Sequence, residues 1–306
     1  MPRARPAAML NAMDENRRAH GPVETPSGKG AGDENFPVGS WLLPRGSRPH
    51  VARFYAFARA IDDIADNPAL APADKVARLD AMGAALDGAV AQDPAFAKAH
   101  RLRASLIETG VDARHGHDLI AAFKQDATKL RYDDWDDLIG YCNLSAAPVG
   151  RYLLDLHGEP RAGYAASDAL CNALQVINHL QDCGDDYRNL GRVYLPLDWL
   201  AAAGAEVAEL GGTQTGPRLR AVIDRTLAEV AGLLLDARPL PAQMRNRRLA
   251  METAVILRIA ERLTEELRRR DPLAGRVVLS RLDYVRCATE GIAGLWIRRR
   301  RGGRET

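Results

Sequence analysis

The sequence predicts an all-α protein that folds as one helical domain. Ala, Leu, Arg, Asp and Glu dominate blocks of roughly 15 to 25 residues that end at Pro or Gly, as helices do. No run of alternating β-branched residues indicates a strand. No internal repeat and no polar linker separates the blocks, so a single bundle is favoured over two domains.

The helical blocks lie between two polar ends. Residues 1–34 are rich in Pro, Gly, Arg, Asn and Glu and lack apolar periodicity, so we expect a flexible leader. The helical domain is expected over residues 35–298, and residues 299–306 are expected to form a basic tail.

Helix boundaries follow from capping residues and prolines. Ser47 and Pro49 are typical of an N-cap and a first turn, and this first helix is expected to stop before Pro68. Further helices are expected over residues 72–90, 95–109, 115–130, 133–156, 163–188, 214–236, 241–269 and 274–298. Pro148 lies inside one of these segments, where it should remove a backbone hydrogen bond and kink the helix.

Charge and composition exclude several classes of protein. The chain has 42 basic and 40 acidic residues, a net charge of +2, which argues against a nucleic-acid-binding protein. Its mean hydropathy is -0.26, and no stretch approaches the roughly 18 to 20 apolar residues of a spanning helix. Asp14 and Glu15 interrupt the N-terminus before an apolar run forms, so we expect no signal peptide and a cytoplasmic protein. The four cysteines are scattered, without the spacing of a metal site.

A first acidic stripe lies in the first expected helix. Tyr55, Arg59, Asp62 and Asp66 follow one another at steps of four, three and four, and therefore share one face. Asp63 lies about 100° round the axis, close enough to add a carboxylate. Like charges at this spacing repel, and the helix dipole disfavours them near a C-terminus. Something must therefore compensate the negative charge.

The surroundings of this stripe favour a cation over water. The flanking positions are apolar nearly all the way round, which is typical of a helix buried in a bundle. Buried charges face one another, a metal or a cavity. Mg²⁺ takes oxygen ligands and commonly bridges carboxylates to phosphates, while the planar fork of Arg59 suits phosphate oxygens. The alternative is a solvated acidic helix end.

A second stripe repeats this pattern. Gln175, Asn178, Asp182 and Asp186 are spaced three, four and four apart, with Asp185 beside them. Two such stripes could present carboxylates from opposite walls to Mg²⁺ ions and a diphosphate. Taken alone, the second stripe is also compatible with a polar surface.

The two stripes, in this order and followed by GRVYLP at residues 191–196, resemble the squalene/phytoene synthase family over about residues 33–298. The resemblance implies one isoprenoid-synthase bundle with a central cavity, in which the two aspartate-rich helices face each other. It also implies Mg²⁺-dependent handling of a prenyl diphosphate substrate.

The resemblance also implies roles for individual residues. The Mg²⁺ ligands, direct or supporting, would be Asp62, Asp63, Asp66, Asp182, Asp185 and Asp186. The substrate-binding residues would be Asn35, Tyr55, Arg59, Gln175, Asn178, Gln181, Arg192 and Tyr194. Tyr55 and Arg59 would hold diphosphate oxygens and act in catalysis with Tyr141, which matches a cavity tyrosine of the family. The alternative for Tyr141 is a ring packed in the core.

Two departures from the family pattern indicate a branch. Asn35 stands in place of a diphosphate-binding Ser, and Gln181 in place of an Arg that is common before the first aspartate of the second motif. These features resemble the branch in bacterial hopanoid biosynthesis that uses one diphosphate. The implied reaction is ionisation of presqualene diphosphate, rearrangement, and capture of the carbocation by water to give hydroxysqualene. No nicotinamide cofactor is expected, since no dinucleotide fingerprint follows a strand.

Other functions and partners remain open at this stage. Within the family, the alternative is a presqualene diphosphate, squalene or phytoene synthase that condenses two prenyl diphosphates. A non-catalytic helical assembly factor is the other alternative, although such relatives usually lose the aspartates. The resemblance implies handover from a presqualene diphosphate synthase and to a hydroxysqualene reductase. A basic cluster at residues 298–304 follows an apolar helix and is compatible with peripheral contact at the inner face of the cell membrane, or with a solvated tail.

Overall fold

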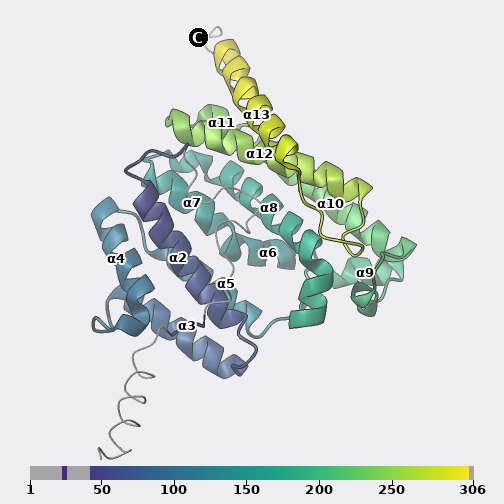
Figure 1. Ribbon diagram of the computed structural model, residues 1–306, viewed down its shortest axis with the longest axis horizontal. Coiled ribbons are helices and arrows are strands. Elements are labelled where there is room, and N and C mark those ends of the chain that lie inside the picture. Colours follow the sequence, from purple (N-terminus) through teal and green to yellow (C-terminus); the bar gives the residue numbers. More distant parts are fainter. Residues whose placement is uncertain (1–22, 26–41, 303–306) are drawn as a thin grey trace, which may run out of the picture.

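The computed structural model describes residues 23–25 and 42–302, with side chains up to Ile297 (Figure 1). All regular elements in these residues are helical, which confirms the predicted fold class. The first half contains α2 (Arg48–Ala65), α3 (Pro72–Asp87), α4 (Ala97–Thr109), α5 (Arg114–Asp126), α6 (Trp135–Ser145) and α7 (Ala147–Leu156). The second half contains α8 (Tyr164–Asp185), α9 (Leu197–Ala203), α10 (Pro217–Ala237), α11 (Leu240–Gln243), α12 (Arg247–Arg269) and α13 (Arg281–Gly302).

The helices are arranged around a central group. Figure 1 shows α6, α7 and α8 in the middle, with α2 to α5 on one side and α9 to α13 on the other. Apolar side chains form one core among α2 to α5 and a larger one around α8, α10 and α12. Tyr152 of α7 joins the first group by stacking on Phe54 of α2, with ring centroids 4.0 Å apart. The C-terminal ends of α2 and α5 lie close to the segment that follows α8, because Arg192 in that segment contacts residues at both helix ends.

Helix α2 begins where the sequence predicts. Ser47 occupies the N-cap position and Pro49 lies in the first turn, although the Ser47 side chain makes no capping hydrogen bond. Phe54, Phe57 and Ile61 are buried along one side of the helix. Their burial leaves the stripe with Arg59 facing away from this apolar packing.

The predicted single helix over residues 133–156 is wrong, because two helices occupy this segment. The backbone leaves helical geometry at Ala146, with φ -122° and ψ -46°, and α7 starts at the next residue. Pro148 lies in the first turn of α7, where its missing N–H costs no intrahelical bond. The proline therefore starts a new helix and does not kink a continuous one.

The C-terminal segments also differ from the expected boundaries. The predicted helix over 241–269 is broken at Met244, and Asn246 then caps α12 by accepting hydrogen bonds from the Arg248 and Leu249 amides. Residues 274–280, predicted as helix, are not helical, and α13 starts only at Arg281. Helix α9 was not predicted, because its seven residues are too few to show a clear period.

Part of the predicted leader is packed against the bundle. The Val23 amide donates to the Ala95 carbonyl at 3.2 Å, and the buried Glu24 pairs with Lys98 at 2.8 Å. The rest of that leader, Asn35 and residues 303–306 lie outside the described residues. Within the described part of the chain, no helix is long and apolar enough to cross a bilayer.

Helices α12 and α13 approach closely at a glycine. A Cβ added to Gly291 would lie 2.7 Å from the Ala254 carbonyl oxygen, whereas one added to Gly294 would meet nothing within 4 Å. We expect Gly291→Ala to destabilise the protein by about 1–3 kcal/mol, because the helices must separate. Gly294→Ala is the matched control and should stabilise by up to about 1 kcal/mol through helix propensity. Chemical unfolding of both variants tests this, and equal stability would contradict it.

Candidate active site

The first acidic stripe lies at the C-terminal end of α2, as predicted. Arg59 pairs with Asp62 at 2.5 Å and with Asp63 at 3.0 Å. Burial, reinforced by the neighbouring Asp66, raises the pKa of Asp62 to about 7. Tyr55 is half-buried one turn earlier on the same face. The stripe thus concentrates more negative charge than its own arginine compensates.

The second stripe lies at the end of α8. Asp182 is half-buried, whereas Asp185 is exposed and pairs with Arg188 at 2.8 Å. Asp186 begins a π-helix (Asp186–Leu190) that ends at Gly191, which has a φ of 65°. Such wide turns frequently occur at functional sites. Gln175 and Asn178 are half-buried on the preceding turns.

Arg192 connects these helix ends. Its guanidinium pairs with Asp66 at 2.6 Å and donates to the Asp126 carbonyl at 3.1 Å and the Ala65 carbonyl at 3.4 Å. The contacts link the end of α2, the end of α5 and the segment that follows α8. Arg192 is only 7% exposed, so in this structure it binds protein groups at the base of the site.

A buried carboxyl group lies beneath this arginine. Asp126 accepts hydrogen bonds from the Tyr141 hydroxyl at 2.7 Å and the Tyr194 hydroxyl at 3.0 Å. Burial raises its pKa to about 6 despite the nearby Arg192. Tyr132 packs against both phenol rings, with centroids 5.3 and 5.6 Å away. Tyr141 is therefore a buried tyrosine with a hydrogen-bonded hydroxyl at one side of the site.

A histidine on α8 completes this aromatic group. The His179 ring stacks on Tyr194 with centroids 3.5 Å apart, and its Nε2 lies 3.3 Å from the Gln175 amide nitrogen. Burial lowers the pKa of His179 to about 3, so the imidazole is neutral. In that state Nε2 accepts a hydrogen bond from the amide.

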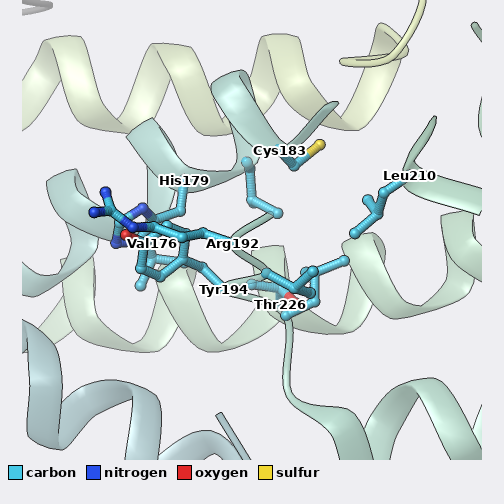
Figure 2. A pocket seen from close by; sticks show the side chains of 10 residues that line it. Val176, His179, Cys183, Arg192, Tyr194, Leu210 and Thr226 are labelled. Carbon is cyan, nitrogen blue, oxygen red and sulfur yellow. The ribbon is translucent and has the colours of Figure 1, made fainter. Parts of the chain in front are cut away.

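These residues border a small pocket between α8, the segment after it and α10. Figure 2 shows His179, Arg192 and Tyr194 grouped on one side, with Leu210 on the other. The cavity measures only about 10 Å³, roughly the room that one water molecule needs, whereas ordinary ligand pockets hold about 300–1,000 Å³. This mainly apolar space is too small for a prenyl chain, so the central cavity that the resemblance implies stays a prediction.

Gln181 stands where the family commonly has an Arg, but another arginine lies next to it in space. Gln181 is buried and donates to the Val277 carbonyl, so its side chain holds the segment that precedes α13. The adjacent Arg276 pairs with Asp182 at 2.9 Å. Arg276 therefore supplies a positive charge at the C-terminal end of α8, although it is far from this helix in the sequence.

Sequence reasoning missed four residues of this site. They are Asp126, Tyr132, His179 and Arg276. Asp126 and Tyr132 stand alone in their segments, and Arg276 is 94 residues from its partner, so no spacing pattern connects them to the stripes. His179 was detectable as a polar residue beside Asn178 in a buried helix.

The carboxylates suit a hard divalent ion. Each stripe provides oxygen donors four residues apart, and Mg²⁺ is usually held by one or two carboxylates together with substrate phosphates and water. The pKa of Asp62 is raised first by burial and then by the charge of Asp66, and a bound cation would offset both effects. Asp62, Asp66, Asp182 and Asp186 are the residues that would hold it. Within the described residues, no three His, Cys, Asp or Glu side chains are close enough to form an ion site by themselves.

An all-α bundle with aspartate stripes and arginines at the ends of two helices is typical of the helical enzymes that act on prenyl diphosphates. Residues 30–283 match the Squalene/phytoene synthase family, and the chain belongs to this family of enzymes.

A hydroxysqualene synthase from Rhodopseudomonas palustris is 47% identical over 262 residues, which cover 86% of this chain and 89% of that protein. One from Zymomonas mobilis is 44% identical and covers 88% and 90%. Squalene synthase HpnC from Alicyclobacillus acidocaldarius has a similar structure, with a TM-score of 0.68, 32% identity, and coverage of 87% of this chain and 96% of that one.

Proposed function

We propose that this enzyme is a hydroxysqualene synthase, which converts presqualene diphosphate and water into hydroxysqualene and diphosphate. The observation that carries the proposal is the 44–47% identity to enzymes of that name along most of both chains. Identity to a phytoene synthase from Paracoccus is lower, at 32% over a similar length. The stronger similarity favours the hydrating branch over condensation of two diphosphates.

The aspartate stripes would receive the diphosphate end of the substrate. Bound Mg²⁺ would neutralise the charge that develops on the leaving diphosphate. Arg59 would exchange its pairing with Asp62 for phosphate oxygens, which match its planar fork equally well. Tyr55, on the same face one turn earlier, would donate a hydrogen bond to the same group.

The carbocation would be left beside the aromatic group. This group consists of the rings of Tyr141, Tyr194 and His179, whose centroids lie within 6.0 Å of one another. Their π-electrons would stabilise the positive charge through cation–π interactions. The neighbouring pocket is lined mainly by apolar side chains, which would exclude all but a few water molecules. The number of water molecules at the cation would therefore be controlled by the few polar groups present.

We assign the water-positioning role to His179 together with Gln175. Tyr141 is less suited to it, because its hydroxyl proton is directed at Asp126. Asn143 is exposed and accepts from Asn172 outside this group. Nε2 of the neutral His179 ring would accept a hydrogen bond from water in place of the Gln175 amide and so hold the water oxygen toward the carbocation. When the water oxygen bonds to the carbocation, the released proton would pass to solvent, because an imidazole with a pKa of about 3 is a weak base.

Isotope labelling tests the overall function. Purified protein given presqualene diphosphate and Mg²⁺, without a nicotinamide, should release diphosphate and a C30 alcohol. In ¹⁸O-enriched water the label should appear in the alcohol, and added NADPH should not divert the product to squalene. Efficient formation of presqualene diphosphate, squalene or phytoene from smaller prenyl diphosphates would instead support the condensing alternative.

Replacing His179 tests the water-positioning role. In His179→Phe we expect the alcohol fraction of the C30 products to fall by about tenfold to a hundredfold in favour of elimination products. Diphosphate release should change little, because ionisation precedes water capture. His117→Phe is the control, since this histidine pairs with Asp87 away from the site. An unchanged product ratio in His179→Phe would show that another group delivers the water.

A further inference from the structure

The C-terminal helix α13 has an apolar outer face. Its inner face packs on α12 through the buried residues Cys287, Gly291 and Leu295. The outer face is formed by exposed residues at steps of three or four along the helix. This set, called the α13 stripe below, consists of Leu282, Val285, Thr289, Ala293, Trp296 and Ile297, and the exposed Arg286 lies among them.

The exposure of this stripe is large. Leu282 is 77% exposed, Val285 60% and Trp296 53%. Half of the large hydrophobic side chains that are exposed among the described residues lie on this one helix. Single exposed hydrophobic residues are ordinary, but several in register along a helix mark an interaction surface.

The charge of the helix indicates the kind of partner. Helix α13 contains six arginines and two acidic residues, a net charge of +4, whereas the whole chain carries only +2. The rest of the protein therefore has a net charge of -2. The two acidic residues are occupied, since Asp283 pairs with Arg262 and Glu290 with Arg258 and Arg286. Four consecutive arginines occupy residues 298–301, directly after the apolar Trp296 and Ile297.

We propose that the α13 stripe docks on a membrane surface that contains anionic lipid. A helix with an apolar face, an interfacial Trp and a basic end is suited to lie in the headgroup region, where lipid phosphates attract the arginines. In Figure 1 the C-terminal half of α13 extends beyond α11 and α12, so a broad surface can reach it. A second copy of the chain fits less well, because it would bring two helices of charge +4 together.

Vesicle binding tests the proposal without substrate and is thus independent of the proposed function. The full-length protein should co-float with vesicles of phosphatidylcholine and phosphatidylglycerol, and much less with phosphatidylcholine alone. Added salt should weaken the binding. Leu282→Gln combined with Trp296→Ala should lower the partition coefficient at least about tenfold. Replacing Arg298 and Arg299 with Gln should lower it about fivefold per residue.

Matched controls separate a specific surface from general stickiness. Ile107→Gln and Leu235→Gln remove exposed apolar side chains on α4 and α10, and should leave binding unchanged. The variants at Leu282, Trp296, Ile107 and Leu235 should keep the wild-type melting temperature, since these side chains are exposed. Equal binding to neutral and anionic vesicles, or equal loss in the controls, would overturn the proposal. So would a dimer in sedimentation that the stripe variants dissociate, because the stripe would then belong to a second copy.

Discussion

Asp62→Asn is expected to lower kcat by at least about 100-fold without destabilising the fold. In the proposed function the carboxylate would bind the metal that holds the diphosphate, but the folded protein without them holds this charge at a cost. Burial and the adjacent Asp66 raise its pKa to about 7, well above the ordinary value of 3.8. Neutral Asn relieves that repulsion, while Arg59 keeps its contact with Asp63. We therefore expect a melting temperature equal to or above that of the wild type.

Steady-state kinetics and thermal unfolding together test this prediction. Asp182→Asn should lose activity to a similar extent, and EDTA should abolish wild-type turnover until Mg²⁺ is added back. Asp224→Asn is the matched control, because Asp224 pairs with Arg220 on the surface of α10, away from both stripes. A fully active Asp62→Asn variant, or full activity in EDTA, would remove the basis for the metal assignment. A clear fall in melting temperature would show that Asp62 acts chiefly in the fold.

The parts of the site that the sequence predicts are those with local spacing. Asp62 and Asp66, or Asp182 and Asp186, share a helix face because four residues make about one turn, whatever the rest of the fold does. The apolar flanks of the first stripe likewise predict burial, and its helix is indeed buried along Phe54, Phe57 and Ile61. The all-α class followed from the same periodicity.

The parts that the sequence did not predict depend on distant contacts. Asp126 becomes part of the site because Tyr141 and Tyr194 donate hydrogen bonds to it from two other segments. Arg276 reaches Asp182 because residues before α13 run along the end of α8. The breaks at Ala146 and Met244 have the same origin, since tertiary packing decides where a helical pattern is interrupted.

Arg192 is a further residue whose contacts in the fold could not be predicted from the local sequence motif. Its place in the GRVYLP sequence predicts a substrate-binding residue, yet its guanidinium lies 2.6 Å from Asp66 and reaches two backbone carbonyls at helix ends. Buried Arg192 also faces the carboxyl group of Asp126, whose charge it stabilises. Loss of this guanidinium would leave negative charge and carbonyl groups buried without a donor.

Arg192→Met is therefore expected to destabilise the protein by about 3–5 kcal/mol, the usual cost of removing one partner of a buried ion pair. Met has a similar length but no charge and no donor. Arg192→Lys should cost less, because it keeps the charge but cannot reach three acceptors with a planar fork. Arg258→Met is the matched control, since the Arg258 side chain is 42% exposed and its two glutamate partners keep other arginines, and it should cost no more than about 1 kcal/mol.

A double-mutant cycle by chemical unfolding connects this cost to Asp126. If Arg192 compensates the buried carboxyl group, Arg192→Met should be less damaging in an Asp126→Asn background, by about 1–3 kcal/mol. Asn keeps an oxygen that can accept from Tyr141 and Tyr194, so the hydrogen bonds beneath the site are retained while the charge is removed. Additive effects would mean that Arg192 stabilises the helix ends through Asp66 and the carbonyls alone. An Arg192→Met variant as stable as Arg258→Met would show instead that the guanidinium is available to the substrate, as its position in the motif predicts.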